Sequence, residues 1–455
     1  MNVDVLVAEI GSTTTVVNAF DGLASDRPRF VGQGKAGTTV EAGDVSLGLE
    51  EAIADLRKNL AVSELHWGQM QASSSAAGGL RMTVHGLVYE MTVRAARETC
   101  LGSGGVIKYV TAGHLRRADI RKIGEIQPNI IFLAGGTDYG ERDTALDNAE
   151  LLMENFPRIP LIYAGNVANH EELKLLAEDF GCKLYLSENV YPELDRINTE
   201  PARLLIHRVF EQHIIHSPGM EKIRELVTGP IVPTPGAVME AAILAAESLG
   251  DLLVFDVGGA TTDVHSVTEG NPNNIEFSLQ GEPRAKRSVE GDLGVFVNRR
   301  HLLEKFTEEE QQKRIPEAER IVEELKKIPE TPEQLDFAEA LTEKACAVAL
   351  DRHTGQWVER FTADGVRRYI EGKDLTAIQR VVGTGGALTR LPHGRQILEA
   401  LIRAPRGKKL LPPPEAEISI DQDYIMASLG VLCKTHPEAA LKLLLHSLGL
   451  GDCAT

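Results

Sequence analysis

Two short segments, Val5–Thr15 and Leu252–Asp263, carry the same arrangement of residues that could bind a phosphate group. In each, an apolar run leads to a carboxylate, then to a glycine and a small residue, and then to a pair of threonines. The equivalent residues are Glu9 and Asp256, Gly11 and Gly258, Thr14 and Thr261, and Thr15 and Thr262. This order predicts a strand, a tight turn and a second strand in both places.

The chemistry of such turns suits phosphate. Backbone N–H groups and threonine hydroxyls donate hydrogen bonds to phosphate oxygens, and glycine permits close approach because it lacks a Cβ. One isolated copy is more often a plain turn. The second copy, together with a third glycine-rich segment at Gly383–Gly386, favours a nucleotide held between two facing hairpins.

Several other elements must position these turns. Residues 46–60 have the apolar spacing of an amphipathic helix, and the small residues of Ala237–Leu249 predict a helix directly before the second hairpin. We expect a rigid turn at Gly229–Gly236, where prolines cluster, and a strand followed by a glycine turn and a helix start at Arg380–Ala387. Charged helical segments at 305–345 and terminal helices at 424–433 and 437–448 complete the pattern.

A different pattern occupies the middle of the chain. Strands and helices alternate there, which predicts a small parallel sheet with crossover helices. The strands are expected at 128–138, 160–166 and 182–186, and the helices at 144–156 and 169–180. The predicted organisation is therefore a first lobe at 1–84, an inserted parallel α/β module at 85–215 and a second lobe at 216–455.

Composition limits the class of protein. The length of 455 residues predicts more than one core, and the apolar share of 43% is ordinary for a globular chain. The net charge of −18 argues against a broad nucleic-acid surface. We expect neither a membrane span nor a secretory signal. Five scattered cysteines without a CxxC pair argue against a zinc ribbon and fit a reducing cytoplasm.

The ordered hairpins, connecting helix, glycine turn and final helix resemble the actin–Hsp70–sugar kinase superfamily. This likeness implies an α/β, two-lobed (RNase H-like) ATPase fold that carries the inserted module. Nearly the whole chain further resembles the glutamate-mutase-associated MutL family, which shares only its name with the mismatch-repair protein. The segments that carry this second resemblance are Glu9–Thr15, Ser74–Met82, Ser288–Gly294, Gly383–Leu388 and Asp423–Gly430.

The superfamily resemblance implies a site for ATP and Mg²⁺ between the lobes. Carboxylates at Glu9, Asp256 and Asp263 fall on positions that hold water around the metal, and Asp256 could also orient the attacking water. Glu9 departs from the usual aspartate, which puts rapid hydrolysis in doubt. The residues expected to contact nucleotide are Gly11, Ser12, Thr13, Thr14, Gly258, Gly259, Ala260 and Thr261 at the phosphates, and Gly383, Gly385 and Gly386 at the adenosine.

Several of these assignments have plain structural alternatives. Asp263 could cap or pair locally instead of serving a metal. The glycines of Gly135–Asp138 are those of a β–α turn, with a second ligand site as the alternative. Ser74–Gly79 indicates close packing rather than a catalytic serine, because no partner histidine is evident. Cys100 and Cys346 are expected as buried thiols rather than cluster ligands.

The family resemblance implies an ATP-binding, slowly hydrolysing protein that reactivates or chaperones an adenosylcobalamin-dependent mutase or aminomutase. Its expected partners are that mutase and a nucleotide, with no nucleic acid and no membrane, and a homo-oligomer is compatible with the sequence. A small-molecule kinase of the same fold is the alternative, although no general base can be nominated. An ATP-dependent activator without an iron–sulfur cluster and a scaffold without turnover stay open.

Overall fold

The computed structural model describes residues 1–39, 44–75, 80–103, 105–194, 196–214, 221–279, 281–362, 365–405 and 407–451. Its contacts divide the chain into two compact units. The first, called here the repeat unit, comprises residues 1–76 and 225–455, and the second, the inserted unit, comprises residues 77–224. The sequence-based limits of the inserted module, 85 and 215, stay predictions.

The repeat unit contains a first five-stranded sheet in the order β10-β4-β1-β2-β3. β1 and β2 form the first hairpin, and β4 pairs with β1 in parallel. The strands are β1 (Asn2–Ile10), β2 (Thr14–Asp21), β3 (Arg29–Gly37), β4 (His66–Ser74) and β10 (Ile231–Pro233). The short β10 replaces part of the expected rigid turn, and its proline is tolerated because β10 is an edge strand.

A second sheet repeats this topology in the order β13-β12-β11-β16-β17. β11 and β12 form the second hairpin, and β16 pairs with β11 in parallel, as β4 does with β1. The strands are β11 (Leu252–Val257), β12 (Thr262–Val267), β13 (Ala285–Glu290), β16 (Arg380–Thr384) and β17 (Glu417–Ile420). A separate hairpin, which the sequence did not indicate, is formed by β14 (Gln356–Thr362) and β15 (Gly365–Glu371).

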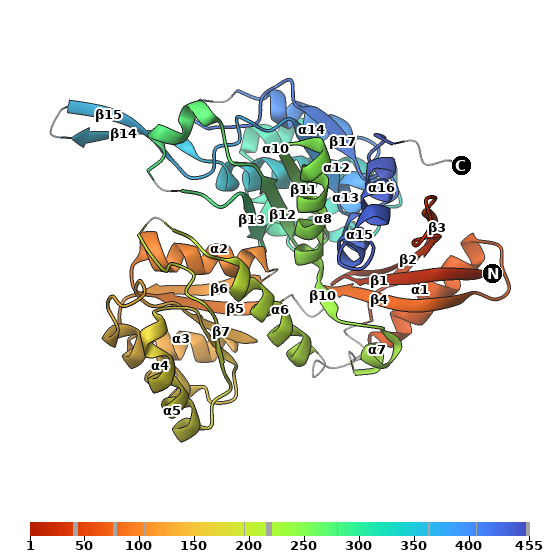
Figure 1. The fold of residues 1–455 in the computed structure, drawn as a ribbon. Helices are drawn as coiled ribbons and strands as arrows, with labels where there is room; N and C mark the ends of the chain where they lie inside the picture. Colours follow the sequence, from red (N-terminus) through yellow and green to blue (C-terminus); the bar gives the residue numbers. More distant parts are fainter. Residues whose placement is uncertain are drawn as a thin grey trace. The chain divides into compact units, whose positions relative to one another are not determined.

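The repeat unit also contains helices, several of them where the sequence predicts amphipathic or small-residue segments (Figure 1). They are α1 (Ser46–Asn59), α8 (Thr234–Leu249), α9 (Arg299–Leu303), α10 (Glu308–Arg314), α11 (Ala318–Glu324), α12 (Pro332–His353), α13 (Gly386–Arg390), α14 (Gly394–Arg403), α15 (Met426–Leu432) and α16 (Pro437–Ser447). The short α7 (Glu221–Leu226) spans the boundary between the two units. No helix within the described ranges has the length and apolar character needed to cross a membrane.

The helices α8 and α15 join the two repeated sheets. One hydrophobic cluster includes Val5 and Val7 of β1, Leu252 and Val254 of β11, and buried residues of both helices. The small residues let α8 and α15 approach closely, since a Cβ on Gly430 would lie only 1.8 Å from the carbonyl oxygen of Ala237. The sequence thus uses glycine and alanine here for backbone contact between helices.

The inserted unit has its own parallel sheet, in the order β6-β5-β7-β8-β9. Its core lies between this sheet and helices that include α3, α4 and α5. The strands are β5 (Leu80–Gly86), β6 (Gly105–Ala112), β7 (Ile130–Leu133), β8 (Leu161–Tyr163) and β9 (Leu184–Leu186). The helices are α2 (Arg94–Gly102), α3 (Arg117–Ile126), α4 (Asp143–Asn155), α5 (His170–Phe180) and α6 (Glu200–Ile214).

The close contact at Gly430 predicts a strong effect of a single methyl group. The variant G430A should lower the free energy of unfolding by about 1–3 kcal/mol or more, because the new Cβ must displace the backbone of α8. Urea denaturation followed by circular dichroism measures this change.

Gly124 of α3 provides the matched control. It is an exposed helical glycine whose added Cβ would have its nearest neighbour at 3.7 Å. The variant G124A should keep or raise stability, by about 0.5–1 kcal/mol, because alanine favours the helix. Equal effects of the two substitutions would contradict the packing argument.

Candidate functional site

The two predicted turns have the same hydrogen-bond geometry. The N–H of Gly11 donates to the carbonyl of Thr14 at 3.0 Å, and the N–H of Gly258 donates to the carbonyl of Thr261 at 2.9 Å. We call residues 11–14 the first turn and residues 258–261 the second turn. The duplicated sequence pattern therefore gives a duplicated local structure.

In the second turn, the carbonyl groups accept hydrogen bonds, whereas the N–H groups of Gly259 and Ala260 at its tip have no acceptor in the described ranges. The loop after β13 donates backbone N–H groups to the carbonyls of Gly258 and Gly259, and the Asn298 side chain donates to the carbonyl of Ala260 at 3.0 Å. Within the described ranges, no acceptor takes the N–H of Gly259 or Ala260. The turn therefore presents donors, which is the arrangement that binds anions.

The loop that covers the second turn explains one family segment. Gly294 packs against Ala260, so that a Cβ on Gly294 would lie 2.2 Å from the Ala260 carbonyl carbon. The hydroxyl of Thr262 also donates to the carbonyl of Leu293 at 2.7 Å. Gly294 thus fixes the second turn from behind, a role that sequence reasoning did not assign.

The first turn has the same donor character and lies close to the second. The carbonyl of Thr13 accepts from the N–H of Thr38 at 3.1 Å, and the hydroxyl of Ser12 donates to the carbonyl of Ser75 at 2.8 Å. A Cβ placed on Gly259 would lie 3.1 Å from Oγ1 of Thr13. The tips of the two hairpins therefore meet.

The third glycine segment lies beside Asp256. Gly385 has a φ of +81°, and an added Cβ would lie 2.5 Å from Oδ1 of Asp256. Gly386 begins α13 and has open space where a side chain would be, whereas the space beside Gly383 is filled by core side chains such as Ile420 and Leu398. Gly385 and Gly386 border the turns, and Gly383 makes room for packing beneath them.

The three predicted carboxylates occupy comparable positions in the two repeats. Glu9 lies opposite Val16 in the first hairpin, and Asp256 lies opposite Asp263 in the second. Glu9 and Asp263 are buried, whereas Asp256 is partly exposed. The second hairpin thus carries two facing acids where the first carries one acid and a valine.

Poor solvation and mutual repulsion make these acids hard to ionise. Burial raises the pKa of Glu9 to about 7, against the opposing hydrogen bond from Tyr424. Burial also raises the pKa of Asp256 well above its usual range, and the neighbouring charges of Asp263 and Glu9 raise it further. The region therefore favours a proton or a cation among the carboxylates.

Asp263 makes a local ion pair and keeps one oxygen available. Its Oδ2 lies 3.4 Å from the guanidinium of the buried Arg287 on β13. Burial raises the pKa of Asp263 to about 6, although Arg287 lowers it. The other oxygen, Oδ1, has no hydrogen-bond partner within the described ranges, and neither does Oε2 of Glu9.

These unpartnered oxygens fit a hydrated cation better than a direct metal cage. Magnesium prefers oxygen ligands and commonly keeps several of its waters. Among the described residues, no three histidine, cysteine or acidic side chains gather closely enough to hold a metal together. Glu9, Asp256 and Asp263 therefore suit contact with a cation through water.

Tyr424 and Asp421 also belong to this region, and sequence reasoning missed both. The hydroxyl of Tyr424, a residue with a φ of +55°, donates to Oε1 of Glu9 at 3.2 Å. Asp421 is fully buried and accepts from the hydroxyl of Thr384 at 2.9 Å and from the N–H of Met426 at 2.8 Å. An acid shortly before a predicted helix is a capping signal that could have indicated Asp421.

The remaining candidates have structural roles in the described ranges. Cys100 and Cys346 are buried free thiols. Asp138, after β7, accepts hydrogen bonds at Oδ1 from the N–H of Val167 at 3.1 Å and from the side chain of Asn189 at 2.9 Å, which favours a structural turn. Residues 76–79 of the predicted Ser74–Gly79 packing segment and Cys453 lie outside the described residues.

The repeated sheets, the paired hairpins and the connecting helices define a two-lobed, actin-like ATPase fold of the kind shared by actin, Hsp70 and sugar kinases, with an inserted parallel α/β module. This confirms the predicted fold class. The family model described as MutL protein matches residues 5–448. The chain therefore belongs to the MutL protein family, as its motifs indicated.

One similar protein agrees with the family assignment. The chain is 34% identical to "Protein MutL" of Clostridium tetanomorphum over 455 residues, which covers 96% of this chain and 98% of that protein. Two solved structures share weak similarity at 12% identity. Nucleotide-free acetone carboxylase has a TM-score of 0.38, and the match covers 94% of this chain and 70% of that one. Nucleotide-free diol dehydratase-reactivating factor has a TM-score of 0.37, and the match covers 95% of this chain and 100% of that one.

The raised pKa of Glu9 predicts a pH dependence of stability. Between pH 4.5, the ordinary value, and about 7, the unfolded chain loses the Glu9 proton while the folded chain keeps it. The free energy of unfolding should therefore fall as pH rises through this interval, by about 3 kcal/mol from Glu9 alone. The variant E9Q should lack this contribution, which urea denaturation at several pH values measures.

The variant Y424F sharpens the same experiment. Removing the hydroxyl that hydrogen-bonds Glu9 withdraws stabilisation from the ionised carboxylate, so the pKa of Glu9 should rise and the fall in stability should extend to higher pH. If E9Q and the original protein gave parallel pH profiles, the burial argument for Glu9 would be wrong.

Proposed function

We propose that this chain binds ATP with Mg²⁺ and uses it, with slow hydrolysis, to reactivate or chaperone an adenosylcobalamin-dependent mutase or aminomutase. The observation that carries the nucleotide part is the meeting of two equivalent turns beside three poorly solvated carboxylates. Family membership supports the accessory role, because the family resemblance implies service to such mutases.

In this proposal the two turns bind the phosphates. Backbone N–H groups and hydroxyls of Gly11–Thr14 and Gly258–Thr261 would donate to the phosphate oxygens, and Gly385 and Gly386 would lie against adenosine, with Gly383 supporting them from the core. Sequence and structure show no lysine after the first turn, where Val16 and Val17 continue the buried strand. Backbone donors would therefore carry most of the recognition.

The carboxylates would hold the cation through water. Asp256 and Asp263 face each other across the second hairpin, and Glu9 adds a carboxylate from the first. When bound, Mg²⁺ would neutralise charge on the phosphates and on these acids. Asp256, the partly exposed member, is the best placed to accept a proton from an attacking water molecule, whereas Glu9 is already held by Tyr424.

A conformational change would transmit the nucleotide state of this chain to the mutase. The helices α8 and α15 connect the repeated sheets, and a change at the turns could rotate one sheet against the other about them. We further propose that the inserted module, residues 85–215, contacts the mutase, because it lies outside the repeated nucleotide-binding topology. Gly236 and Gly430 are the proposed positions next to the hinge.

The variant D256N tests the nucleotide site. Loss of this carboxylate should weaken Mg·ATP binding at least roughly tenfold or slow phosphate release by a similar factor, equivalent to about 1.4 kcal/mol. Calorimetric titration with Mg·ATP and a phosphate-release assay measure the two effects. The control is D336N, an exposed position on α12, which should leave both unchanged. Unchanged values in D256N would remove Asp256 from the site.

Reactivation is the test of the accessory role. Adenosylcobalamin-dependent mutases and aminomutases of the same organism would be purified, inactivated with hydroxocobalamin and incubated with this chain, Mg·ATP and fresh adenosylcobalamin. Activity should return for the cognate mutase with ATP and not with ADP, and it should not return with D256N. Absence of rescue for every such enzyme, together with phosphorylation of a small metabolite, would replace this proposal with the kinase alternative.

A further inference from the structure

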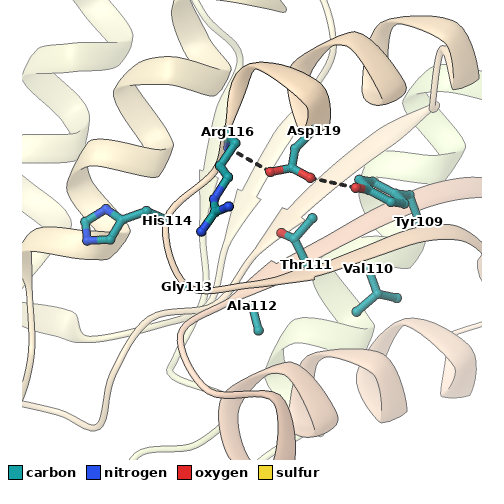
Figure 2. Close-up of a pocket in the computed structure, with 8 residues that line it drawn as sticks. All are labelled: Tyr109, Val110, Thr111, Ala112, Gly113, His114, Arg116 and Asp119. Carbon is teal, nitrogen blue, oxygen red and sulfur yellow. Dashed lines mark hydrogen bonds between the residues drawn. The ribbon is translucent and has the colours of Figure 1, made fainter.

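The inserted unit contains a cavity that the proposed function does not use. It has a volume of about 490 Å³ and is lined by residues 109–114, Arg116 and Asp119 (Figure 2). Pockets for small molecules usually have volumes of about 300–1,000 Å³. The cavity is therefore large enough for a small organic molecule and not only for an ion.

The cavity lies at the carboxyl edge of the sheet of the inserted unit. It lies at the carboxyl end of β6, next to the end of β5, because the N–H of Gly113 donates to the carbonyl of Gly86 at 2.9 Å. The strand order β6-β5-β7-β8-β9 is that of a doubly wound sheet, whose usual ligand position is the point where the strand order reverses, here between β5 and β7. The cavity lies on the other side of β5, at the end of the edge strand β6. Gly113 has a φ of +78°, and a Cβ there would have no neighbour within 4 Å.

Arg116 supplies an available positive charge at this cavity. Its side chain is exposed and extends into the space beside Gly113 and Thr111 in Figure 2. In the part of the chain that the structure describes, no acceptor or acid pairs with its guanidinium group. A planar guanidinium with unused donors matches the two-oxygen edge of a phosphate or a carboxylate.

Asp119, the acidic residue that lines the cavity, is hydrogen-bonded to other groups of the protein. Oδ1 of Asp119 accepts from the hydroxyl of Tyr109 at 2.6 Å, and Oδ2 accepts from the backbone N–H of Arg116 at 2.7 Å. These bonds hold Tyr109 and the main chain of Arg116 in place. They also form part of the capping box at the start of α3, whose ten residues begin at Arg117.

The floor of the cavity is fixed by a buried neutral histidine. Nδ1 of His85 lies 2.8 Å from Oγ1 of Thr111, and its Nε2 lies 3.0 Å from Oγ1 of Thr83. Burial lowers the pKa of His85 to about 3, so the ring is uncharged at neutral pH. At the rim, His114 is 3.6 Å from Oδ2 of Asp147 and is thereby occupied.

From this arrangement we propose that the cavity binds an oxyanion, the phosphate or carboxylate group of a small metabolite, through the guanidinium group of Arg116. The remaining volume, bordered by Tyr109, Val110 and Ala112, would accommodate the less polar part of the same molecule. This site is separate in sequence from the turns at residues 11–14 and 258–261, and it adds a second ligand to the proposed nucleotide.

The test is calorimetric titration of the full chain with inorganic phosphate and, separately, with succinate. Binding that depends on the cavity should weaken at least tenfold in R116Q and only partly in R116K, which keeps the charge without the planar fork. The control is R121Q, on the next turn of α3 and paired with Glu125, which should bind as the original protein does. A tighter value for phosphate assigns a phosphorylated ligand, and a tighter value for succinate assigns a carboxylate.

Crystals soaked in tungstate, a heavy oxyanion, locate the site directly. An anomalous peak next to Arg116 that disappears in R116Q is the expected result. Thermal melting of R116Q checks that the exposed substitution leaves the fold intact. A peak at the turns but not near Arg116, or equal affinities for R116Q and R121Q, would overturn the inference and leave the nucleotide proposal in place.

Discussion

The structure depends on a concentration of buried acid at the ends of two equivalent strands. Glu9 is the last residue but one of β1, Asp256 occupies the same place in β11, and Asp263 faces Asp256 across the hairpin. Carboxylates that share so little water cannot all ionise without a compensating proton or cation. The packing around them holds the three carboxylates close together in spite of the repulsion among their charges.

The surrounding packing explains how the acids stay together. The connecting helices α8 and α15 use glycine and alanine to approach each other, and the same hydrophobic cluster contains residues of both central strands. Close helix contact brings the two sheets near enough for the hairpin tips to meet at Thr13 and Gly259. The small residues of α8 and α15 therefore allow the close approach that brings the carboxylates of the two hairpins together.

Much of this was predictable from the sequence, because the decisive signals are local. The hairpins, the helices at α1, α4, α5 and α8 and the alternating pattern of the inserted unit follow from apolar spacing and glycine position. Contacts between distant segments were not predictable. Tyr424 and Glu9 form a hydrogen bond although they are 415 positions apart, and the sequence around either residue does not indicate this contact. β13, with its charged residues and the buried Arg287, also lacks the apolar alternation of a strand.

Asp421 connects several C-terminal elements to the site. Its two oxygens accept from Thr384 at the end of β16, from the first N–H groups of α15 and from the hydroxyl of Ser447 at 2.5 Å. Through Asp421, hydrogen bonds connect the last turn of α16 to the end of β16, the strand that precedes Gly385. Sequence changes near residue 447 would therefore alter the hydrogen bonds that position Gly385 and the strand before it, although the two segments are far apart in the sequence.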